Sequence, residues 1–203
     1  MTAIYLASRS PRRRELLAQI GVKFEMLLFR EGPRQDAETS EIPYPGEHPD
    51  DYVRRVTRLK AEAAWQRVVV RKGLGRMPVL AADTTVALAN EILGKPADRA
   101  DAARMLRLLA GTRHRVLTAV AVAFEDRLDM RVSESLVTFC PLDEGRIANY
   151  VASGEPFDKA GGYGIQGRAA AFVERLEGSY SGVMGLPLFE TAALLREFGV
   201  TVP

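Results

Sequence analysis

The sequence predicts an α/β fold built on a mixed β-sheet with flanking helices. Short apolar runs alternate with longer segments of helical spacing along the whole chain, which is the pattern of α/β proteins. Some neighbouring strand-like runs are separated only by turn residues, and such hairpins pair strands antiparallel. The 203 residues, of which 47% are hydrophobic, suffice for a sizeable core. We therefore expect helices packed on a sheet that is not purely parallel.

A strand and a helix open the chain. Residues 4–7 are apolar and predict a short buried strand, and residues 11–20 predict the helix that follows it. Ser10 is suited to cap that helix, and Pro11 to occupy its first position, where a missing N–H costs nothing. Gly21 ends the helix, and residues 22–29 predict a second strand.

A long loop and a long helix come next. Residues 30–50 are rich in proline, glycine and charge, which predicts an extended loop. Residues 50–70 place their apolar side chains at helical spacing. Residues 78–82 predict a buried strand that runs into Asp83, and residues 86–93 predict a hairpin that turns at Asn90.

The second half of the chain continues the alternation. Residues 97–109 predict a helix between the cap Asp98 and the stop Gly111, and residues 143–152 predict another helix. The remaining expected elements are strands at 115–124, 131–139 and 169–176, a glycine-rich segment at 159–167, and a last helix at 188–198.

The composition excludes several classes of protein. The net charge of +2 is too small to indicate nucleic-acid binding. The single cysteine, Cys140, rules out an internal disulfide, and its strand-like surroundings predict a buried structural thiol. No stretch has the length of a membrane span, and no leader segment precedes the first strand. We expect a cytoplasmic protein that contacts neither nucleic acid nor membrane.

The start of the first helix is a candidate anion site. A strand that turns into a helix leaves free N–H groups and the positive end of the helix dipole pointing outward. Ser8, Arg12 and Arg13 add a hydroxyl and two guanidinium groups suited to phosphate oxygens. The alternative is a solvated basic turn, although cations are unfavourable at a helix N-terminus.

Asp83 is the candidate catalytic carboxylate. It follows an apolar strand, and α/β sheets place ligand and catalytic groups at strand ends. A carboxylate there can bind Mg²⁺ or accept a proton from water. The alternative is a turn aspartate that bonds nearby backbone. Lys95, in the loop Gly94-Lys95-Pro96, is a plausible phosphate contact within a common tripeptide.

Several further residues have both a functional and a structural interpretation. Glu41 offers a second carboxylate or a solvated loop charge, and Lys60 lies near the apolar face of its helix, where snorkelling is the usual explanation. Gln166 could read a base edge from the glycine-rich segment, or belong to a plain turn. His48 and His114 have no partner at metal-ligand spacing. Together the basic, hydroxyl and carboxylate groups suit a triphosphate with a divalent metal.

These motifs resemble the Maf family of nucleoside triphosphate pyrophosphatases, a group once called septum formation inhibitors. The matching stretches occur in family order over nearly the whole chain, at residues 7–13, 82–86, 92–96, 111–116, 150–167, 177–181 and 185–187. The resemblance implies one domain over residues 1–203, with two α/β lobes around a groove, similar to inosine triphosphate pyrophosphatases. It also implies a homodimer that hydrolyses a nucleoside triphosphate to the monophosphate and pyrophosphate with Mg²⁺ or Mn²⁺.

The resemblance assigns roles to individual residues. Asp83 would accept the proton from water and bind the metal together with Glu41. The phosphates would be held by Ser8, Arg12, Arg13, Lys60 and Lys95. Arg12, Thr84 and Gln166 occupy positions linked to substrate choice, and Thr84 with Gln166 resembles the branch that acts on dTTP and UTP. A small threonine and an amide can match the O4/N3 edge of a pyrimidine.

Two departures from the family pattern leave alternatives open. Ser40 stands where an acid is common, and the loop before it is longer than usual, so Glu38 is the alternative to Glu41 as the metal ligand. That loop could also admit a modified base, and 7-methyl-GTP or another modified nucleotide is the alternative substrate. The alternative in a different class is a regulator of septation that binds nucleotide without turnover.

Overall fold

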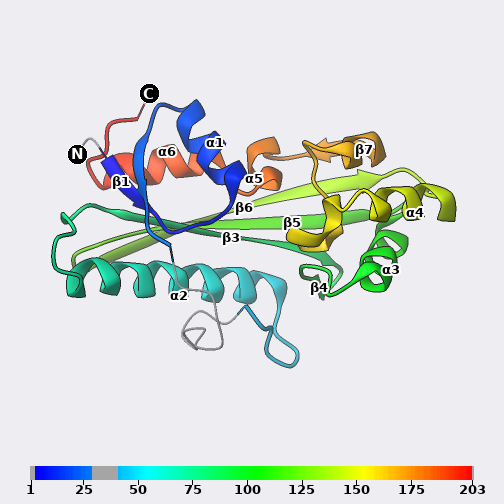
Figure 1. The fold of residues 1–203 in the computed structure, drawn as a ribbon, viewed down its shortest axis with the longest axis horizontal. Coiled ribbons are helices and arrows are strands. Elements are labelled where there is room, and N and C mark those ends of the chain that lie inside the picture. The colour runs from blue at the N-terminus through cyan, green and yellow to red at the C-terminus, as the bar shows by residue number, and fades with distance from the viewer. Residues whose placement is uncertain (1–2, 29–40, 203) are drawn as a thin grey trace.

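The computed structural model describes residues 3–28 and 41–202, and its elements follow the predicted α/β alternation (Figure 1). The strands are β1 (Ala3–Leu6), β2 (Lys23–Met26), β3 (Val79–Leu88), β4 (Glu91–Leu93), β5 (Arg113–Phe124), β6 (Arg127–Phe139) and β7 (Val173–Glu177). The α-helices are α1 (Pro11–Gln19), α2 (Pro49–Val70), α3 (Arg99–Leu109), α4 (Glu144–Ala152), α5 (Tyr180–Met184) and α6 (Leu188–Glu197). Short 3₁₀ helices are η2 (Glu155–Asp158), η3 (Ala160–Gly162) and η4 (Arg168–Phe172).

The strands form one mixed sheet in the order β2-β1-β3-β5-β6-β7, with β4 paired to β3. Strand β1 is parallel to β2 and β3, whereas β3, β5, β6 and β7 are successively antiparallel. The predicted hairpin β3–β4 is present, and its turn places Ala89 at a φ of 52°. The predicted fold class is therefore confirmed.

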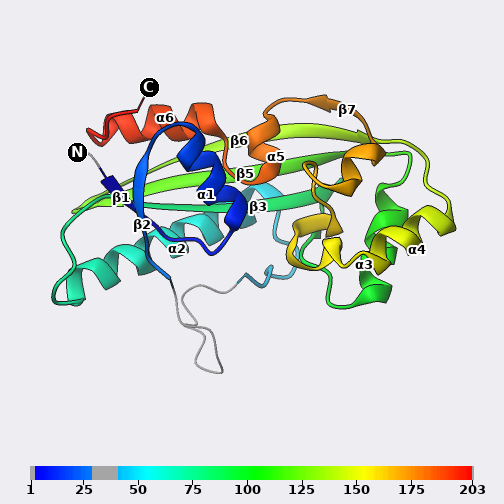
Figure 2. The same ribbon diagram turned by 45° about the horizontal axis from the view of Figure 1, so that its top comes forward.

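Helices cover both faces of the sheet (Figures 1 and 2). Alternate side chains of β3 contact the helices on opposite faces. Leu80 and Ala82 pack with apolar side chains of α1 and α6 on one face. Val79 and Ala81 point to the other face, where Ala64 and Trp65 of α2 cover them. Because side chains alternate in a strand, Asp83 shares the α2 face and Thr84 shares the α1 face.

A second core cluster lies at the far end of the long strands, where α3, α4 and the glycine-rich segment pack together. Gly161 lies there at a φ of 68°, and a Cβ on it would come within 2.9 Å of the Val86 side chain. The glycine therefore permits the segment to approach the sheet closely. The sequence suggested a close approach to a ligand, but at Gly161 the close approach is to β3.

Strand β3 does not end at Asp83, so the predicted strand boundary is wrong. Asp83 lies in the middle of a ten-residue strand that pairs with β5 from Val79 to Ala87. On the other edge, β1 pairs only with Val79 and Leu80, and β4 only with residues 86–88. Among the described residues no strand pairs with 81–85 on that edge. Asp83 therefore lies beside the end of β1 rather than at the end of its own strand.

Other predicted boundaries also need correction. Residues 169–176 are not one strand, because η4 occupies 168–172 and only then does β7 begin. Strand β6 begins earlier than predicted because its register with β5 extends back to Arg127. Strand β2 ends at Met26, and Phe29 lies outside the described residues. The loop before the last helix contains α5.

Two further expectations concern the single cysteine and membrane spans. Cys140 is half-buried rather than buried, because it follows the last residue of β6, and a guanidinium nitrogen of Arg146 lies 3.5 Å from its sulfur. None of the helices in the described part of the chain is long and apolar enough to cross a membrane.

Candidate active site

A groove of about 650 Å³ lies beside the open edge of β3, a volume typical of small-molecule sites. Its walls come from the β1–α1 connection, α2, β3, the loop after β4, the glycine-rich segment and α5. It contains the nine residues to which the family resemblance assigned roles: Ser8, Arg12, Arg13, Glu41, Lys60, Asp83, Thr84, Lys95 and Gln166. The structure thus brings together residues from distant parts of the chain.

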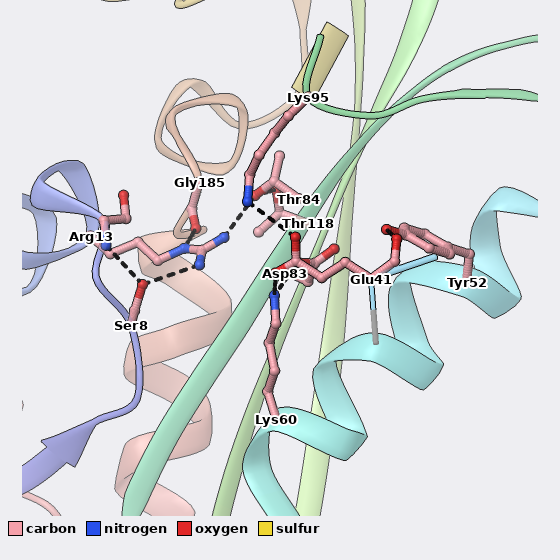
Figure 3. Close-up of polar contacts among 11 residues, drawn as sticks. Ser8, Arg13, Glu41, Tyr52, Lys60, Asp83, Thr84, Lys95, Thr118 and Gly185 are labelled. Carbon is pink, nitrogen blue, oxygen red and sulfur yellow. Dashed lines mark hydrogen bonds and ion pairs between the residues drawn. The ribbon is translucent and has the colours of Figure 1, made fainter. Parts of the chain in front are cut away.

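Lys60 joins the two candidate carboxylates at the centre of the groove (Figure 3). Its Nζ donates to Asp83 Oδ1 at 2.7 Å and to Glu41 Oε1 at 2.6 Å. Lys95 reaches Glu41 Oε2 from the opposite side at 3.0 Å. The structural interpretation of Lys60, a snorkelling surface side chain, is wrong, because the ammonium points into the groove.

Interactions with groups of opposite charge keep Glu41 and Lys60 charged. Burial alone would raise the pKa of Glu41, but the charges and hydrogen bonds of Lys60 and Lys95 outweigh it and lower the pKa to about 2. Burial alone would lower the pKa of Lys60, but Asp83 and Glu41 raise it above its ordinary value. Glu41 is therefore a carboxylate and Lys60 an ammonium at neutral pH.

Arg13 extends from the first turn of α1 into the groove and is held there by three acceptors (Figure 3). Its Nε donates to the Gly185 carbonyl at 2.7 Å, and its terminal nitrogens donate to Ser8 Oγ and Thr84 Oγ1, each at 3.2 Å. Burial lowers the pKa of Arg13, but a guanidinium stays protonated in proteins. Two of its five N–H bonds remain for an anion.

The cap of α1 differs from the expectation. Ser10 occupies the N-cap position before Pro11, as predicted, but its side chain makes no capping hydrogen bond. Instead, the backbone N–H of Ser10 donates to Ser8 Oγ at 3.2 Å. Ser8 therefore organises this turn and also accepts from Arg13. Arg14 is exposed on the next turn.

An ion pair crosses the mouth of the groove, and the sequence did not reveal it. Arg12 donates to Asp158 Oδ2 at 3.0 Å, and the other oxygen of Asp158 accepts from Lys159. Lys159 also donates to the Glu155 carbonyl at 2.7 Å. The predicted glycine-rich segment begins at Lys159, and Asp158, the residue that pairs with Arg12 of α1, lies just before it.

Glu41 is held in place by contacts between its segment and α2. Tyr52 donates its hydroxyl to the Glu41 carbonyl at 2.8 Å. Arg55 donates to the Ile42 carbonyl at 3.1 Å and pairs with both carboxylate oxygens of Glu47 at 2.6 and 2.8 Å. The helix that supplies Lys60 thus also positions the carboxylate that Lys60 binds.

The two candidate base-reading residues lie in different surroundings. The hydroxyl of Thr84 bonds within the protein, to Arg13 and Thr118. Gln166 is exposed on a turn. Gly164 leaves room for it: a Cβ there would lie 2.8 Å from Lys159 Cε and 3.5 Å from Gln166 Oε1. The amide of Gln166 is therefore the group better placed to meet a ligand.

The donor set fits a hard divalent cation that shares its coordination with a substrate. No group of three or more histidine, cysteine or acidic side chains suited to a metal occurs in residues 3–28 and 41–202. Mg²⁺, however, is commonly held by one or two carboxylates together with substrate phosphates, and Asp83 and Glu41 already share the ammonium of Lys60. Glu38, the alternative ligand, and Ser40 lie outside the described residues.

Neither histidine of the chain lines the groove. His114 is buried, its Nε2 lies 2.8 Å from the Tyr163 hydroxyl, and its ring packs edge-on against Phe139. His48 caps α2 by accepting from the Asp50 backbone N–H. Both therefore have structural roles, as their isolated positions indicated.

The chain is similar to known proteins over nearly its whole length. The family model described as Maf-like protein matches residues 3–198. A relative from Cupriavidus metallidurans, named dTTP/UTP pyrophosphatase, is 62% identical and covers 98% of this chain and 99% of its own. Relatives with the same name from Aromatoleum aromaticum and Nitrosomonas europaea are 58% and 53% identical, covering 97% and 98% of this chain and 95% and 96% of theirs.

Among solved structures, the Ham1 protein of Staphylococcus aureus is similar over 97% of both chains, with a TM-score of 0.48 and 16% sequence identity. The fold class described above rests on the sheet order and the strand register, independently of that likeness.

Proposed function

The chain belongs to the Maf-like protein family, and we propose that its groove hydrolyses dTTP and UTP to the monophosphate and pyrophosphate. The observation that carries this proposal is the convergence of Asp83, Lys60 and Glu41 in a groove rimmed by further cations. The groove lining has six basic and three acidic side chains. Such a surface attracts a highly charged anion and retains a carboxylate for proton transfer. A protein that only bound nucleotide would have no use for that carboxylate.

The basic residues bind and orient the phosphate chain. Arg13 has two free N–H bonds and is rigidly held, so it suits bidentate contact with phosphate oxygens. Lys95 and Arg12 exchange their present carboxylate partners for phosphates when the substrate enters. These contacts neutralise the charge that develops on the leaving pyrophosphate.

Asp83 is the general base of the proposed reaction. Water attacks phosphorus and the anhydride between the α- and β-phosphates breaks. The attack is on the α-phosphorus: one proton of the water passes to the Asp83 carboxylate, the hydroxyl stays on the monophosphate, and the bridging oxygen leaves as part of pyrophosphate. Lys60 holds Asp83 in place for this step through the 2.7 Å contact.

Asp83 and Glu41 are the residues that would hold Mg²⁺ or Mn²⁺. A divalent ion there would lower the pKa of a bound water and polarise the phosphoryl oxygens. Lys60 would then give up part of its contact with both carboxylates. The 7% exposure of Asp83 limits competition from bulk water.

Gln166 gives the site its preference for uracil and thymine in this proposal. Its amide offers both a donor and an acceptor, which match the O4 and N3–H of those bases. Cytosine presents the reverse pattern at the same edge, so an amide held in the orientation for uracil would oppose donor to donor and acceptor to acceptor.

We also propose that the protein works as a homodimer in the cytoplasm, where nucleotide pools lie. Light scattering on the purified protein tests the homodimer, and cell fractionation tests the location. A mass of 22.3 kDa in solution is that of one chain and would contradict the dimer.

A substrate panel tests the function. Purified protein with Mg²⁺ or Mn²⁺ receives each ribo- and deoxyribonucleoside triphosphate and 7-methyl-GTP in turn, and the released pyrophosphate is counted. We expect dTTP and UTP to react fastest. Preference for 7-methyl-GTP would overturn the substrate assignment, and no release from any nucleotide would overturn the enzymatic one.

A further inference from the structure

We propose that Thr118, a residue outside the groove, positions the phosphate-binding guanidinium of Arg13 by acting through Thr84. This inference rests on the proposed function of the groove. Thr118 lies on β5 directly opposite Thr84 of β3, as a cross-strand pair in register. It is fully buried and does not line the groove, so it affects a ligand only through its neighbours (Figure 3).

Counting the hydrogens fixes the direction of each bond. The hydroxyl of Thr118 lies 2.7 Å from the carbonyl oxygen of Gly182 and 3.0 Å from the hydroxyl of Thr84. A carbonyl oxygen only accepts, and a threonine hydroxyl has one hydrogen. The hydrogen of Thr118 therefore goes to Gly182, and Thr84 donates its own hydrogen to Thr118.

Thr84 is then oriented as an acceptor toward Arg13. Its oxygen then accepts from the terminal nitrogen of Arg13 at 3.2 Å. The bonds run in one direction, from Arg13 to Thr84, from Thr84 to Thr118, and from Thr118 to Gly182. Loss of the Thr118 hydroxyl would free the Thr84 hydroxyl to rotate and present its hydrogen to Arg13, which cannot accept it.

The short segment around α5 anchors both ends of this chain of bonds. Gly182 supplies the terminal acceptor, and Gly185 accepts from Arg13 Nε at 2.7 Å. Gly185 has a φ of 119°, and a Cβ on it would lie 3.5 Å from Thr84 Oγ1 and 3.6 Å from Arg13 Nε. The Gly185 carbonyl therefore holds the guanidinium directly, and the Gly182 carbonyl acts on it only through Thr118 and Thr84.

The buried pair of Thr84 and Thr118 is useful because of how a guanidinium binds phosphate. A guanidinium binds phosphate strongly only when its N–H bonds are aimed at the oxygens, so a pre-oriented arginine loses less entropy on binding. Thr118 supplies that orientation without touching the substrate. It is a positioning residue for Arg13.

The test compares two substitutions at position 118 with a matched control. Thr118→Val removes the hydroxyl and keeps the shape, whereas Thr118→Ser keeps the hydroxyl. Thr191→Val is the control, because Thr191 is equally buried and its hydroxyl has no hydrogen-bond partner in the described part of the chain. The readouts are KM and kcat for dTTP and UTP, and the inhibition constant of inorganic pyrophosphate.

We expect Thr118→Val to raise KM for both nucleotides and to weaken pyrophosphate inhibition, each about five- to tenfold, as for loss of one oriented hydrogen bond. The value of kcat should change less than KM. Thr118→Ser should restore wild-type values, and Thr191→Val should leave them unchanged. In a Thr84→Val background, Thr118→Val should have no further effect on KM, because the link to Arg13 is already cut.

Three results would overturn the inference: an unchanged KM in a folded Thr118→Val protein, failure of Thr118→Ser to restore KM, or additive effects with Thr84→Val. If Thr118→Val does not fold, Thr118→Ala and Thr84→Val test the same link from either end. Lack of turnover by the wild-type protein is a different failure, that of the proposed function itself, and leaves pyrophosphate binding as the readout for Thr118.

Discussion

At the residue scale, the centre of the groove is a lysine shared by two carboxylates. Lys60 keeps Asp83 and Glu41 together although both are negatively charged. Such an arrangement is costly to bury unless every charge has a partner. It is nevertheless suited to an enzyme whose substrate arrives with a divalent ion, since such an ion on Asp83 and Glu41 would replace Lys60 as their partner and free the ammonium for a phosphate.

Gln166 gives the first prediction at this scale. Replacement of Gln166 by alanine should raise KM for UTP and dTTP by about 3- to 10-fold, the effect of one lost hydrogen bond. It should also reduce the preference for UTP over CTP, because the amide that distinguishes their edges is gone. Steady-state kinetics with both nucleotides measures this change.

A suitable control is Arg168→Lys, an exposed substitution in the same part of the chain but outside the groove lining. It should leave the ratio of UTP to CTP hydrolysis unchanged. An unchanged ratio in Gln166→Ala as well would show that another group reads the base.

At the element scale, the site forms where β3 lacks a strand partner on one edge. Strand β1 ends after Leu6 and the chain turns into α1, which leaves the middle of β3 open. Helix α2 then delivers Lys60 to the face that Asp83 shares, and α1 delivers Arg13 to the face of Thr84. The groove therefore uses both faces of one strand.

The segment that carries Glu41 gives a prediction about an element. Arg55→Lys cannot keep the bidentate contact with Glu47 together with the contact to the Ile42 carbonyl. Glu41 should then be less well positioned, and the Mg²⁺ concentration for half-maximal activity should rise by about 5-fold, on the order of 1 kcal/mol. A titration of activity against Mg²⁺ measures it.

Arg58→Lys on the same helix is the matched control. Arg58 is more than half exposed, and its nearest ion-pair distance, to Glu62, is 3.9 Å, so its replacement should have little effect on the metal requirement. Equal responses of the two variants would mean that the Arg55 contacts do not position Glu41.

The sequence predicted the elements better than their boundaries and partners. Pro11, Asp98 and Gly111 marked helix ends correctly because capping is a local property. The continuation of β3 through Asp83 depends instead on pairing with β5, and no local pattern contains that information. The pair Arg12–Asp158 joins residues 146 positions apart and was likewise not predictable. Most candidate site residues were chosen from local chemistry, and the family motifs added the role that each is expected to have.

At the scale of the whole molecule, the buried histidine links stability to pH. Burial lowers the pKa of His114 to about 4, against 6.5 for an exposed histidine. The folded state therefore holds fewer protons than the unfolded state between these values. The contribution of neutral His114 is complete above pH 6.5 and is lost as the pH falls toward 4.

We predict that the unfolding free energy falls by about 3 kcal/mol between pH 7 and pH 4 from this group alone. In His114→Phe that part of the pH dependence should vanish, even though the variant is less stable at neutral pH after losing the bond to Tyr163. Urea unfolding at several pH values measures how the unfolding free energy changes with pH. His48→Gln, a substitution of the other histidine, should keep the wild-type pH dependence. The same pH dependence in His114→Phe would show that His114 is not its source.

The most direct test of the proposed mechanism compares Asp83→Asn with the wild-type protein on dTTP. Both are incubated with Mg²⁺, and dTMP and pyrophosphate are quantified over time, with Asp129→Asn, a carboxylate on β6 paired with Arg127, as control. We predict equal amounts of the two products from wild type and control, and a rate at least about 100-fold lower for Asp83→Asn. A near-wild-type rate for Asp83→Asn, or release of phosphate instead of pyrophosphate, would contradict the account.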